Sequence, residues 1–379
     1  MGQWLLIVLL PFAAWSGWWL GMRKEARELR QNKSRAAYFE GISHLLNDET
    51  ERAVEVFISI ADVDKQAVDN QLTLGRLFRK RGELDRALHL HQQLMKYEAL
   101  DEVLKQAVQY ELSLDYEQAG MIAQAQELLV VLVNHQYRLQ ETLPILLRLY
   151  EKTQQWQAAI ELAQLWQLSG HGNLSAKVAH YYCELALIMD SSAREECLAL
   201  LHQALQYDRD CARANWILGE YYLQTEQYVN AIHVLQSIAK QRLTLLPDAL
   251  PMLERSYRAL GRFDEYVQWL SLIEARYQKV RLTLACAKVL PQAQAVELLQ
   301  QRLQKQGNSL LFADYLNYRL AEADNALDLP ASFIQMVAPK TIYQCEACGF
   351  RQQRLIWHCP SCAAWGSFYA VIELKIAQR

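Results

Sequence analysis

The chain has 379 residues, a net charge of −3 at pH 7, and only 14 glycines and 8 prolines. The near-neutral charge gives no global sign of a nucleic-acid-binding protein, and no nucleic-acid partner is expected. Because few residues interrupt long runs of helix formers, the composition predicts an all-α protein, with room for two or three domains or for one repeat array.

The first predicted element is a transmembrane helix within residues 1–22. Residues 3–22 carry no charge and are just long enough to span a bilayer. Tryptophans lie towards both ends, at Trp4 and Trp19, and Pro11 is tolerated in a membrane helix. Residues 23–36 form a basic linker, with six Lys/Arg against two Glu over residues 23–35. By the positive-inside rule this linker is cytoplasmic, which leaves the amino terminus on the other side of the membrane.

Two other interpretations apply to this segment. A cleaved signal peptide has its positive charge before the apolar run, whereas here the charge follows it, so we favour an uncleaved anchor. Gly17 and Gly21 form a small-residue motif that can seat a partner helix, but such motifs are also common by chance.

Residues 37–330 are predicted to form an array of helical repeats with a period of 34–38 residues. The template is Leu74-Gly75-x-x-Phe78-x-x-x-Gly82-x-x-x-x-Ala87, and its spacing recurs four more times along the chain. A small residue lets two helices approach, an aromatic fills the gap between them, and a glycine opens the turn. The other copies pass through Leu112–Ser113, Tyr150, Leu218–Gly219 and Tyr257, with Gln154 and Glu226 replacing the turn glycine in two of them.

This pattern resembles the tetratricopeptide repeat, whose helical hairpins stack into a superhelical solenoid. In that family the first helix of each hairpin lines a concave groove that binds peptides. The corresponding basic and aromatic positions would suit an acidic partner, although the arginines also fit a solvated face with intrahelical pairs to glutamate. These candidate groove residues are Arg76, Arg79, Tyr110, Arg148, Trp216, Arg255 and Arg258.

The sequence gives no sign of catalysis. It contains none of the nucleotide-binding, zinc-protease or hydrolase motifs, so we expect no enzyme and no catalytic residue. Four cysteines scattered through the helical pattern are predicted to be core residues of a protein in a reducing compartment. They are Cys183, Cys197, Cys211 and Cys286.

Residues 340–379 are predicted to form a small metal-binding domain. Cys345 and Cys348 form one Cys-x-x-Cys pair, and Cys359 and Cys362 form a second pair ten residues later. Two such pairs can place four sulfurs around one ion, and a domain this short gains much of its stability from that ion. A pair of disulfides is the less specific alternative.

The doubled pair resembles a rubredoxin-type metal fold. Rubredoxins have glycine after both pairs, whereas here Gly349 follows the first and Ala363 the second. Zinc in a structural role is preferred, and an iron site for electron transfer is the alternative. Tyr343, Phe350, Trp357 and Trp365 are expected to surround the site, and the domain is expected to pack on the repeats, because its aromatics would otherwise be exposed. His358 is expected to donate a hydrogen bond to a ligand or to be an exposed ring, rather than to be a ligand itself.

The order of anchor, repeats and metal domain, together with LTLGRLFRKRGELDRALHLHQ, AHYYCELAL and WHCPSCAAW, resembles the lipopolysaccharide assembly protein B family of Gram-negative bacteria. The resemblance implies a single-pass inner-membrane protein, facing the cytoplasm, that regulates lipopolysaccharide synthesis. It would present the committed-step lipid A deacetylase to a membrane-anchored AAA protease and contact other inner-membrane lipopolysaccharide proteins. The alternatives are a scaffold for those enzymes that does not direct proteolysis, and an iron electron-transfer protein. The oligomeric state, including a homo-oligomer, is left open.

Overall fold

The computed structural model describes residues 65–97, 100–170, 172–189, 194–320 and 339–374, together with scattered residues between 15 and 56. The predicted membrane segment lies outside the described residues except for Trp15 and Met22, and so does the basic linker except for Ala36. Among the described residues, no helix combines the length and the apolar character that a membrane span needs.

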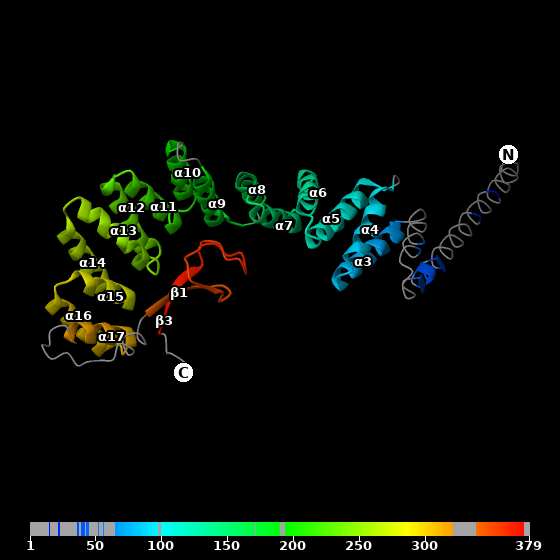
Figure 1. The fold of residues 1–379 in the computed structure, drawn as a ribbon. Coiled ribbons are helices and arrows are strands. Elements are labelled where there is room, and N and C mark those ends of the chain that lie inside the picture. Colours follow the sequence, from blue (N-terminus) through cyan, green and yellow to red (C-terminus); the bar gives the residue numbers. More distant parts are fainter. Residues whose placement is uncertain are drawn as a thin grey trace, which may run out of the picture. The chain divides into compact units, whose positions relative to one another are not determined.

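The chain divides into two compact units, Met1–Gln154 and Gln155–Arg379. In the first unit, consecutive helices pack on one another, and α3 also contacts α5. This is the packing of a helical-hairpin array, and Figure 1 shows the succession of helices. The helices of this unit are α3 (Lys65–Arg81), α4 (Leu84–Met95), α5 (Glu102–Gln118), α6 (Ile122–Asn134) and α7 (Leu139–Lys152).

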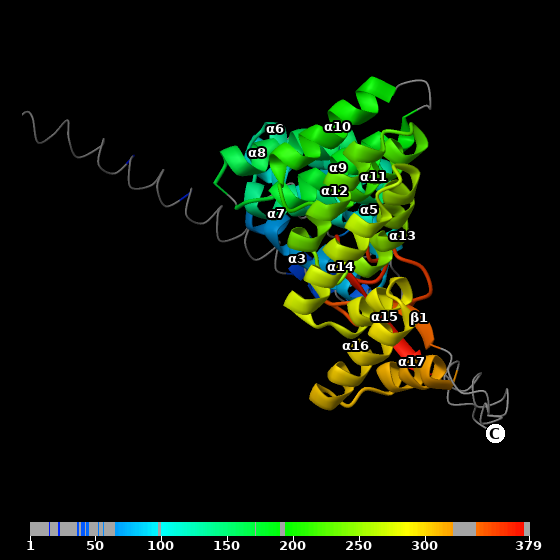
Figure 2. The ribbon, with the colours of Figure 1, turned by 90° about the vertical axis from the view of Figure 1, so that its left-hand side faces the viewer.

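The second unit is also built from successive helices and carries the carboxy-terminal sheet. Its helices also pack in sequence order, and α11 contacts both α9 and α13. Figure 2 shows these helices with the strands beside them. They are α8 (Trp156–Leu168), α9 (Ser175–Ile188), α10 (Arg194–Tyr207), α11 (Ala212–Gln224), α12 (Tyr228–Gln241), α13 (Leu246–Ala259), α14 (Phe263–Tyr277), α15 (Val280–Val289), α16 (Gln292–Lys305) and α17 (Ser309–Leu320).

The turns inside the hairpins have a left-handed residue at the position that the template gives to glycine. Gly82, Gly120 and Gly261 have φ angles of 79°, 76° and 69°. Gln154 and Glu226 adopt the same conformation, with φ of 58° and 59°, although it is unfavourable for a side chain with a Cβ. The turn therefore keeps its geometry in the copies that lack glycine.

The small residues of the template mark close approaches between the helices of a hairpin. A Cβ on Gly75 would overlap the ring of His91, and a Cβ on Gly219 would overlap the side chain of Leu235. The alanines of the template are fully buried at the same interfaces, which confirms the packing role predicted for both positions. These alanines are Ala87, Ala125, Ala159 and Ala231.

The carboxy-terminal domain is a three-stranded antiparallel sheet in the order β2-β1-β3. Its strands are β1 (Pro339–Cys345), β2 (Arg351–Gln352) and β3 (Phe368–Leu374). β1 and β2 form a hairpin in which Tyr343 lies opposite Gln352, and the long pairing of β1 with β3 places Cys345 opposite Phe368. The β1–β2 hairpin turns at the first cysteine pair and therefore does not lie between the two pairs, and β3 follows the second pair. We call residues 339–374 the knuckle domain.

Candidate metal centre

The first cysteine pair lies in the turn between β1 and β2. The backbone N–H of Gly349 donates to the carbonyl of Cys345, and the N–H of Cys345 donates to the carbonyl of Phe350, both at 2.9 Å. Gly349 has a φ of 77°, which favours a residue without a Cβ. This turn brings Cys345 and Cys348 towards the same point.

The second pair forms a matching turn without glycine. The N–H of Ala363 donates to the carbonyl of Cys359, and the N–H of Cys359 donates to the carbonyl of Ala364, again at 2.9 Å. Ala363 adopts a φ of 56°. The departure from the rubredoxin pattern at this position therefore leaves the turn geometry unchanged and places an alanine in a left-handed conformation.

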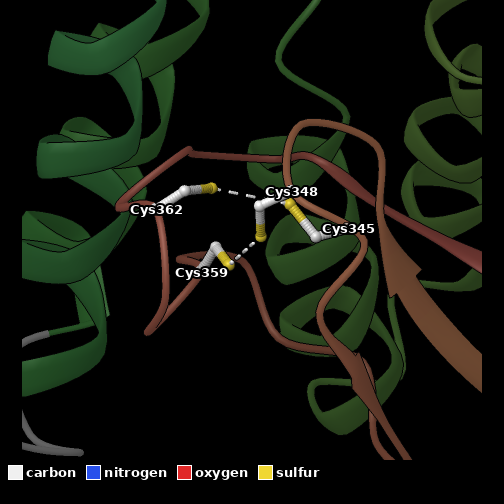
Figure 3. A group of neighbouring side chains, drawn as sticks. All are labelled: Cys345, Cys348, Cys359 and Cys362. Carbon is white, nitrogen blue, oxygen red and sulfur yellow. Dashed lines mark hydrogen bonds between the residues drawn. The ribbon is translucent and has the colours of Figure 1, made fainter.

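The two turns face each other and bring four sulfurs together (Figure 3). The ligand atoms of Cys345, Cys348, Cys359 and Cys362 all lie within 4.8 Å of one another. Cys345 Sγ is 3.7 Å from Cys362 Sγ, and Cys348 Sγ is 3.6 Å from Cys359 Sγ. Four thiolates around a zinc ion with bonds of about 2.3 Å stand about 3.8 Å apart, whereas a disulfide requires about 2.05 Å. The four cysteines thus fit a four-thiolate metal site, and the disulfide alternative is wrong for this geometry.

Hydrogen bonds and crowding set the acidity of these thiols. Burial alone would raise the pKa of Cys345, but hydrogen bonds from the Ser367 hydroxyl and from the backbone of Cys348 and Ala347 lower it to about 6. Cys362 accepts a backbone hydrogen bond from Ala364, which lowers its pKa, yet burial and the neighbouring thiols raise that pKa to about 12. Four thiols this close do not all ionise without a cation, and a divalent ion that replaces their protons resolves the conflict.

The interior of the knuckle domain is small. Cys345, Cys359 and Phe368 are buried in one cluster, with Tyr343 and Leu355 packed against it. Two sulfurs are therefore shielded, while Cys348 and Cys362 remain exposed at the surface.

Of the four aromatics expected around the sulfurs, two point elsewhere. Phe350 packs edge-on against Phe368, with ring centroids 6.5 Å apart, and Tyr343 contacts the buried cluster. Trp357 and Trp365 instead contact the helices of the array. The expectation was wrong for the two tryptophans because the repeats provide larger apolar and aromatic surfaces than the knuckle domain does.

Trp365 inserts among aromatic rings of α8 and α9. Its ring centroid lies 5.8 Å from that of Trp156, 5.9 Å from that of Tyr181 and 5.2 Å from that of His180. Both Trp156 and Tyr181 are buried. On its other side Trp365 stacks on His358, with centroids 4.4 Å apart. His358 therefore supports the docked tryptophan and is not part of the four-sulfur cluster.

Trp357 docks on the next part of the array. Its ring is 6.3 Å from that of Trp216 in α11, in an edge-on arrangement. The guanidinium of Arg213 lies 5.8 Å from the centroid of Trp357 and 5.7 Å from that of Trp365. Leu355 and Trp357 also pack against the buried core of α12 to α15.

Polar contacts complete the docking surface. The Tyr343 hydroxyl donates to Asp248 Oδ1 of α13 at 2.8 Å, and Arg281 of α15 binds both oxygens of the same carboxylate at 2.8 and 2.9 Å. Burial and the Asp248 carboxylate raise the pKa of Tyr343 to about 12. Arg242 makes a longer contact of 3.4 Å with Glu346. The expected packing of the knuckle domain on the repeats is confirmed.

The candidate groove residues occupy different environments. Arg79 is mostly buried and binds Glu111 and Asp115 at 2.6 and 2.7 Å, which joins α3 to α5. Arg76 binds Glu111 at 2.7 Å. Arg76 and Arg79 thus make ion pairs between helices rather than within one helix.

The other candidate groove residues also occupy different environments. Tyr110 is buried, Trp216 is covered by the knuckle domain, and Arg255 is exposed. Arg148 is half-exposed and binds Glu117 of α5, again between helices. Arg258 binds Glu254 within its own helix, as in the alternative interpretation. Binding of a partner by these residues stays a prediction.

Sequence reasoning missed the residues that receive the knuckle domain. His180, Arg213, Asp248 and Arg281 belong to four different helices and to no shared motif. No periodicity or spacing connects them to the cysteines, so only the folded array brings them together.

Comparison with known proteins agrees with both parts of the fold. The family described as rubredoxin metal binding domain matches residues 343–370. Lipopolysaccharide assembly protein B of Escherichia coli K12 is 30% identical over 376 residues, covering 96% of this chain and 97% of the relative. The protein of the same name from Haemophilus influenzae is 28% identical, covering 97% and 98%.

A solved structure, that of Naa15/Naa10 bound to HypK-THB, is similar with a TM-score of 0.51 at 13% identity. The match covers 83% of this chain and 51% of the other one. At this identity the likeness supports the helical-array fold alone.

Proposed function

Because this chain belongs to the lipopolysaccharide assembly protein B family, we propose that it is a non-enzymatic adaptor that regulates lipopolysaccharide assembly by holding other proteins together. The near-complete match in length is consistent with the anchor, repeats and knuckle domain acting as one protein. In this proposal the metal, with zinc preferred over iron, is structural.

The observation that carries the proposal is the surface of stacked hairpins with the knuckle domain docked on it. A repeat array offers an extended surface for protein segments, and docking adds the exposed turns of the knuckle domain to that surface. Arg76 and Arg148 are half-exposed, and an acidic segment of a partner would compete with Glu111 and Glu117 for them. The sequence contains no nucleotide-binding or hydrolase motif that would favour an enzyme.

We further propose a specific pair of partners, the committed-step lipid A deacetylase and a membrane-anchored AAA protease, with the deacetylase presented for degradation. The apolar residues 3–22 would anchor the protein in the inner membrane, with the amino terminus in the periplasm and the array in the cytoplasm. Confinement to the same membrane raises the effective concentration of adaptor and protease towards each other.

The half-life of the deacetylase tests the adaptor proposal. Its half-life should lengthen severalfold in cells that lack this protein and return when the full chain is restored. If the half-life is unchanged while lipopolysaccharide synthesis is disturbed, the protein is a scaffold for synthetic enzymes rather than an adaptor.

Crosslinking identifies the partners directly. A photoreactive residue at Arg255, which is exposed, or at Arg76 should capture the protease or the deacetylase in native membranes. A photoreactive residue at the buried Tyr110 is the matched control and should capture neither. Failure of both exposed positions to capture either protein contradicts this choice of partners.

The colour of the purified protein tests which metal it binds. A four-thiolate iron site absorbs visible light, whereas a zinc site is colourless. A colourless preparation with one zinc per chain agrees with the structural role, and a red preparation with one iron per chain favours electron transfer.

A further inference from the structure

A polar pocket of about 370 Å³ lies where the knuckle domain meets the repeats. His180, Arg213 and Arg242 line it from the array, while Trp357 and Trp365 line it from the knuckle domain. All of these residues belong to the second unit, so docking of the knuckle domain completes the pocket.

Arg213 brings a buried and incompletely paired cation to this pocket. Its side chain is only 4% exposed, and Nη2 donates to Glu184 at 2.9 Å. Nε and Nη1 are buried and have no hydrogen-bond partner among the described residues. The indole faces of Trp357 and Trp365 stabilise the charge, but an aromatic face is a weaker acceptor than an oxyanion. A buried N–H without an acceptor is costly, so this guanidinium favours an added acceptor.

Two further groups at the pocket have unused hydrogen-bonding capacity. His180 Nδ1 is buried and has no partner among the described residues. Burial, together with the charges of Arg213 and Arg242, lowers the pKa of His180 to about 3, so its ring is neutral. Among the described residues, the Arg242 side chain makes a 3.4 Å contact with Glu346, and it is 23% exposed. Gly366 keeps this region open, because a Cβ there would lie 3.0 Å from His180 and 3.6 Å from Arg242.

The amino terminus of α11 lies at the same pocket. Ala212, its first residue, lines the cavity, and the N-cap residue Cys211 makes no side-chain capping bond. The first N–H groups of a helix have no intrahelical acceptor and carry the positive end of the helix dipole. This end of α11 therefore adds to the attraction that Arg213 and Arg242 exert on an anion.

Carboxylates in the pocket lining limit the negative charge that a bound anion can carry. Asp208, Asp210 and Glu346 also line it. Asp208 accepts the backbone N–H of Asp210 at 3.0 Å, and Glu346 faces Arg242. Three acidic side chains around two arginines disfavour a polyanion, but leave room for one small oxyanion at the buried guanidinium.

We propose that this pocket binds one small oxyanion group, a phosphate or a carboxylate, through Arg213, Arg242 and the amino terminus of α11. The bound group would lie at the docked surface, since Arg213 contacts Trp357 and Trp365 and Arg242 contacts Glu346. It would therefore stabilise the docked arrangement by mass action.

Calorimetric titration of the full-length, metal-loaded chain in detergent tests the proposal. Inorganic phosphate and malonate are titrated separately at constant ionic strength set with chloride. We expect saturable binding of at least one of them, and which anion binds identifies the group. The absence of saturable heat with both anions would overturn the proposal.

Matched variants locate the binding. Arg242→Gln should weaken binding at least about tenfold, because it removes a charge-assisted hydrogen bond, while Arg276→Gln at an exposed position of α14 should leave it unchanged. Asp210→Asn should strengthen binding, because it removes a repelling charge from the rim. Binding that is insensitive to Arg242→Gln, or that weakens in Asp210→Asn, contradicts a site in this pocket.

Discussion

At the scale of single residues, Ala363 adopts a backbone conformation that is unfavourable for its residue type. It holds the second cysteine turn at a φ of 56°, where its Cβ is unfavourable, whereas Gly349 holds the first turn at a φ of 77°. The turn geometry is required because the N–H of Ala363 donates to the carbonyl of a metal cysteine. Formation of the four-sulfur cluster therefore offsets the conformational strain of this alanine.

Ala363→Gly should stabilise the metal-bound knuckle domain by about 1 kcal/mol, because glycine adopts the left-handed conformation without a steric penalty. The concentration of chelator that removes half the metal should rise accordingly. Ala364→Gly is the control, since Ala364 is not among the residues with positive φ, and it should lower that concentration. A lower concentration for Ala363→Gly would show that the strain is absent.

Tyr343 is the second residue with a testable role. Its phenol donates to Asp248, and its pKa is raised to about 12 from an ordinary value of 10. A group whose pKa is raised by folding stabilises the fold fully below its unfolded pKa and loses that contribution as the pH rises through the folded value. The docking contribution of Tyr343 should thus be constant up to about pH 10 and disappear towards pH 12.

Tyr343→Phe should remove this contribution and reduce docking stability by about 1–2 kcal/mol, because the Asp248 carboxylate loses the hydrogen bond from the phenol. Limited proteolysis of the knuckle domain as a function of pH measures the effect. Between pH 10 and pH 12 the wild-type chain should become more susceptible, while the variant should change less. Equal pH dependence of both chains would rule out the role given to this phenol.

At the scale of elements, the cysteine turns were predictable because the interactions are local. Spacing alone brings Cys345 near Cys348, and the Gly82 position of the repeat marks a turn wherever it recurs. The direction of Trp365 was not predictable, since its partners Trp156 and Tyr181 lie some 200 residues earlier in the chain. Interactions across that separation depend on the stacking of whole hairpins.

Trp365→Ala should separate docking from metal binding. The substitution removes the ring that lies against Trp156, Tyr181 and His180, at a cost of about 3 kcal/mol. The four sulfurs come from the turns and should still retain the metal. Hydrogen exchange should therefore quicken in α8 and α9 with the metal content unchanged.

Phe350→Ala is the matched aromatic control, because this ring is 37% exposed and packs edge-on against Phe368 within the knuckle domain. Hydrogen exchange of α8 and α9 in the Phe350→Ala variant should resemble that of the wild type. If Trp365→Ala has no greater effect than Phe350→Ala, the tryptophan does not hold the domain in place.

At the scale of the whole molecule, the second unit combines a helical array with a metal-stabilised domain. The array contributes aromatic rings and the Asp248–Arg281 pair, and the knuckle domain contributes two tryptophans and a tyrosine. Because a four-thiolate ion organises so small a domain, loss of the ion should also release the contacts made to the repeats. The account therefore rests on docking being dependent on the metal-bound knuckle domain.

Hydrogen exchange of the full chain before and after removal of the metal by a chelator measures this coupling most directly. The account predicts faster exchange in α8, α9, α11 and α13, whose residues contact the knuckle domain, and unchanged exchange in α3 to α6 of the first unit. Readdition of zinc should restore the original protection. Unchanged exchange in all four contacting helices after complete loss of the metal would contradict it.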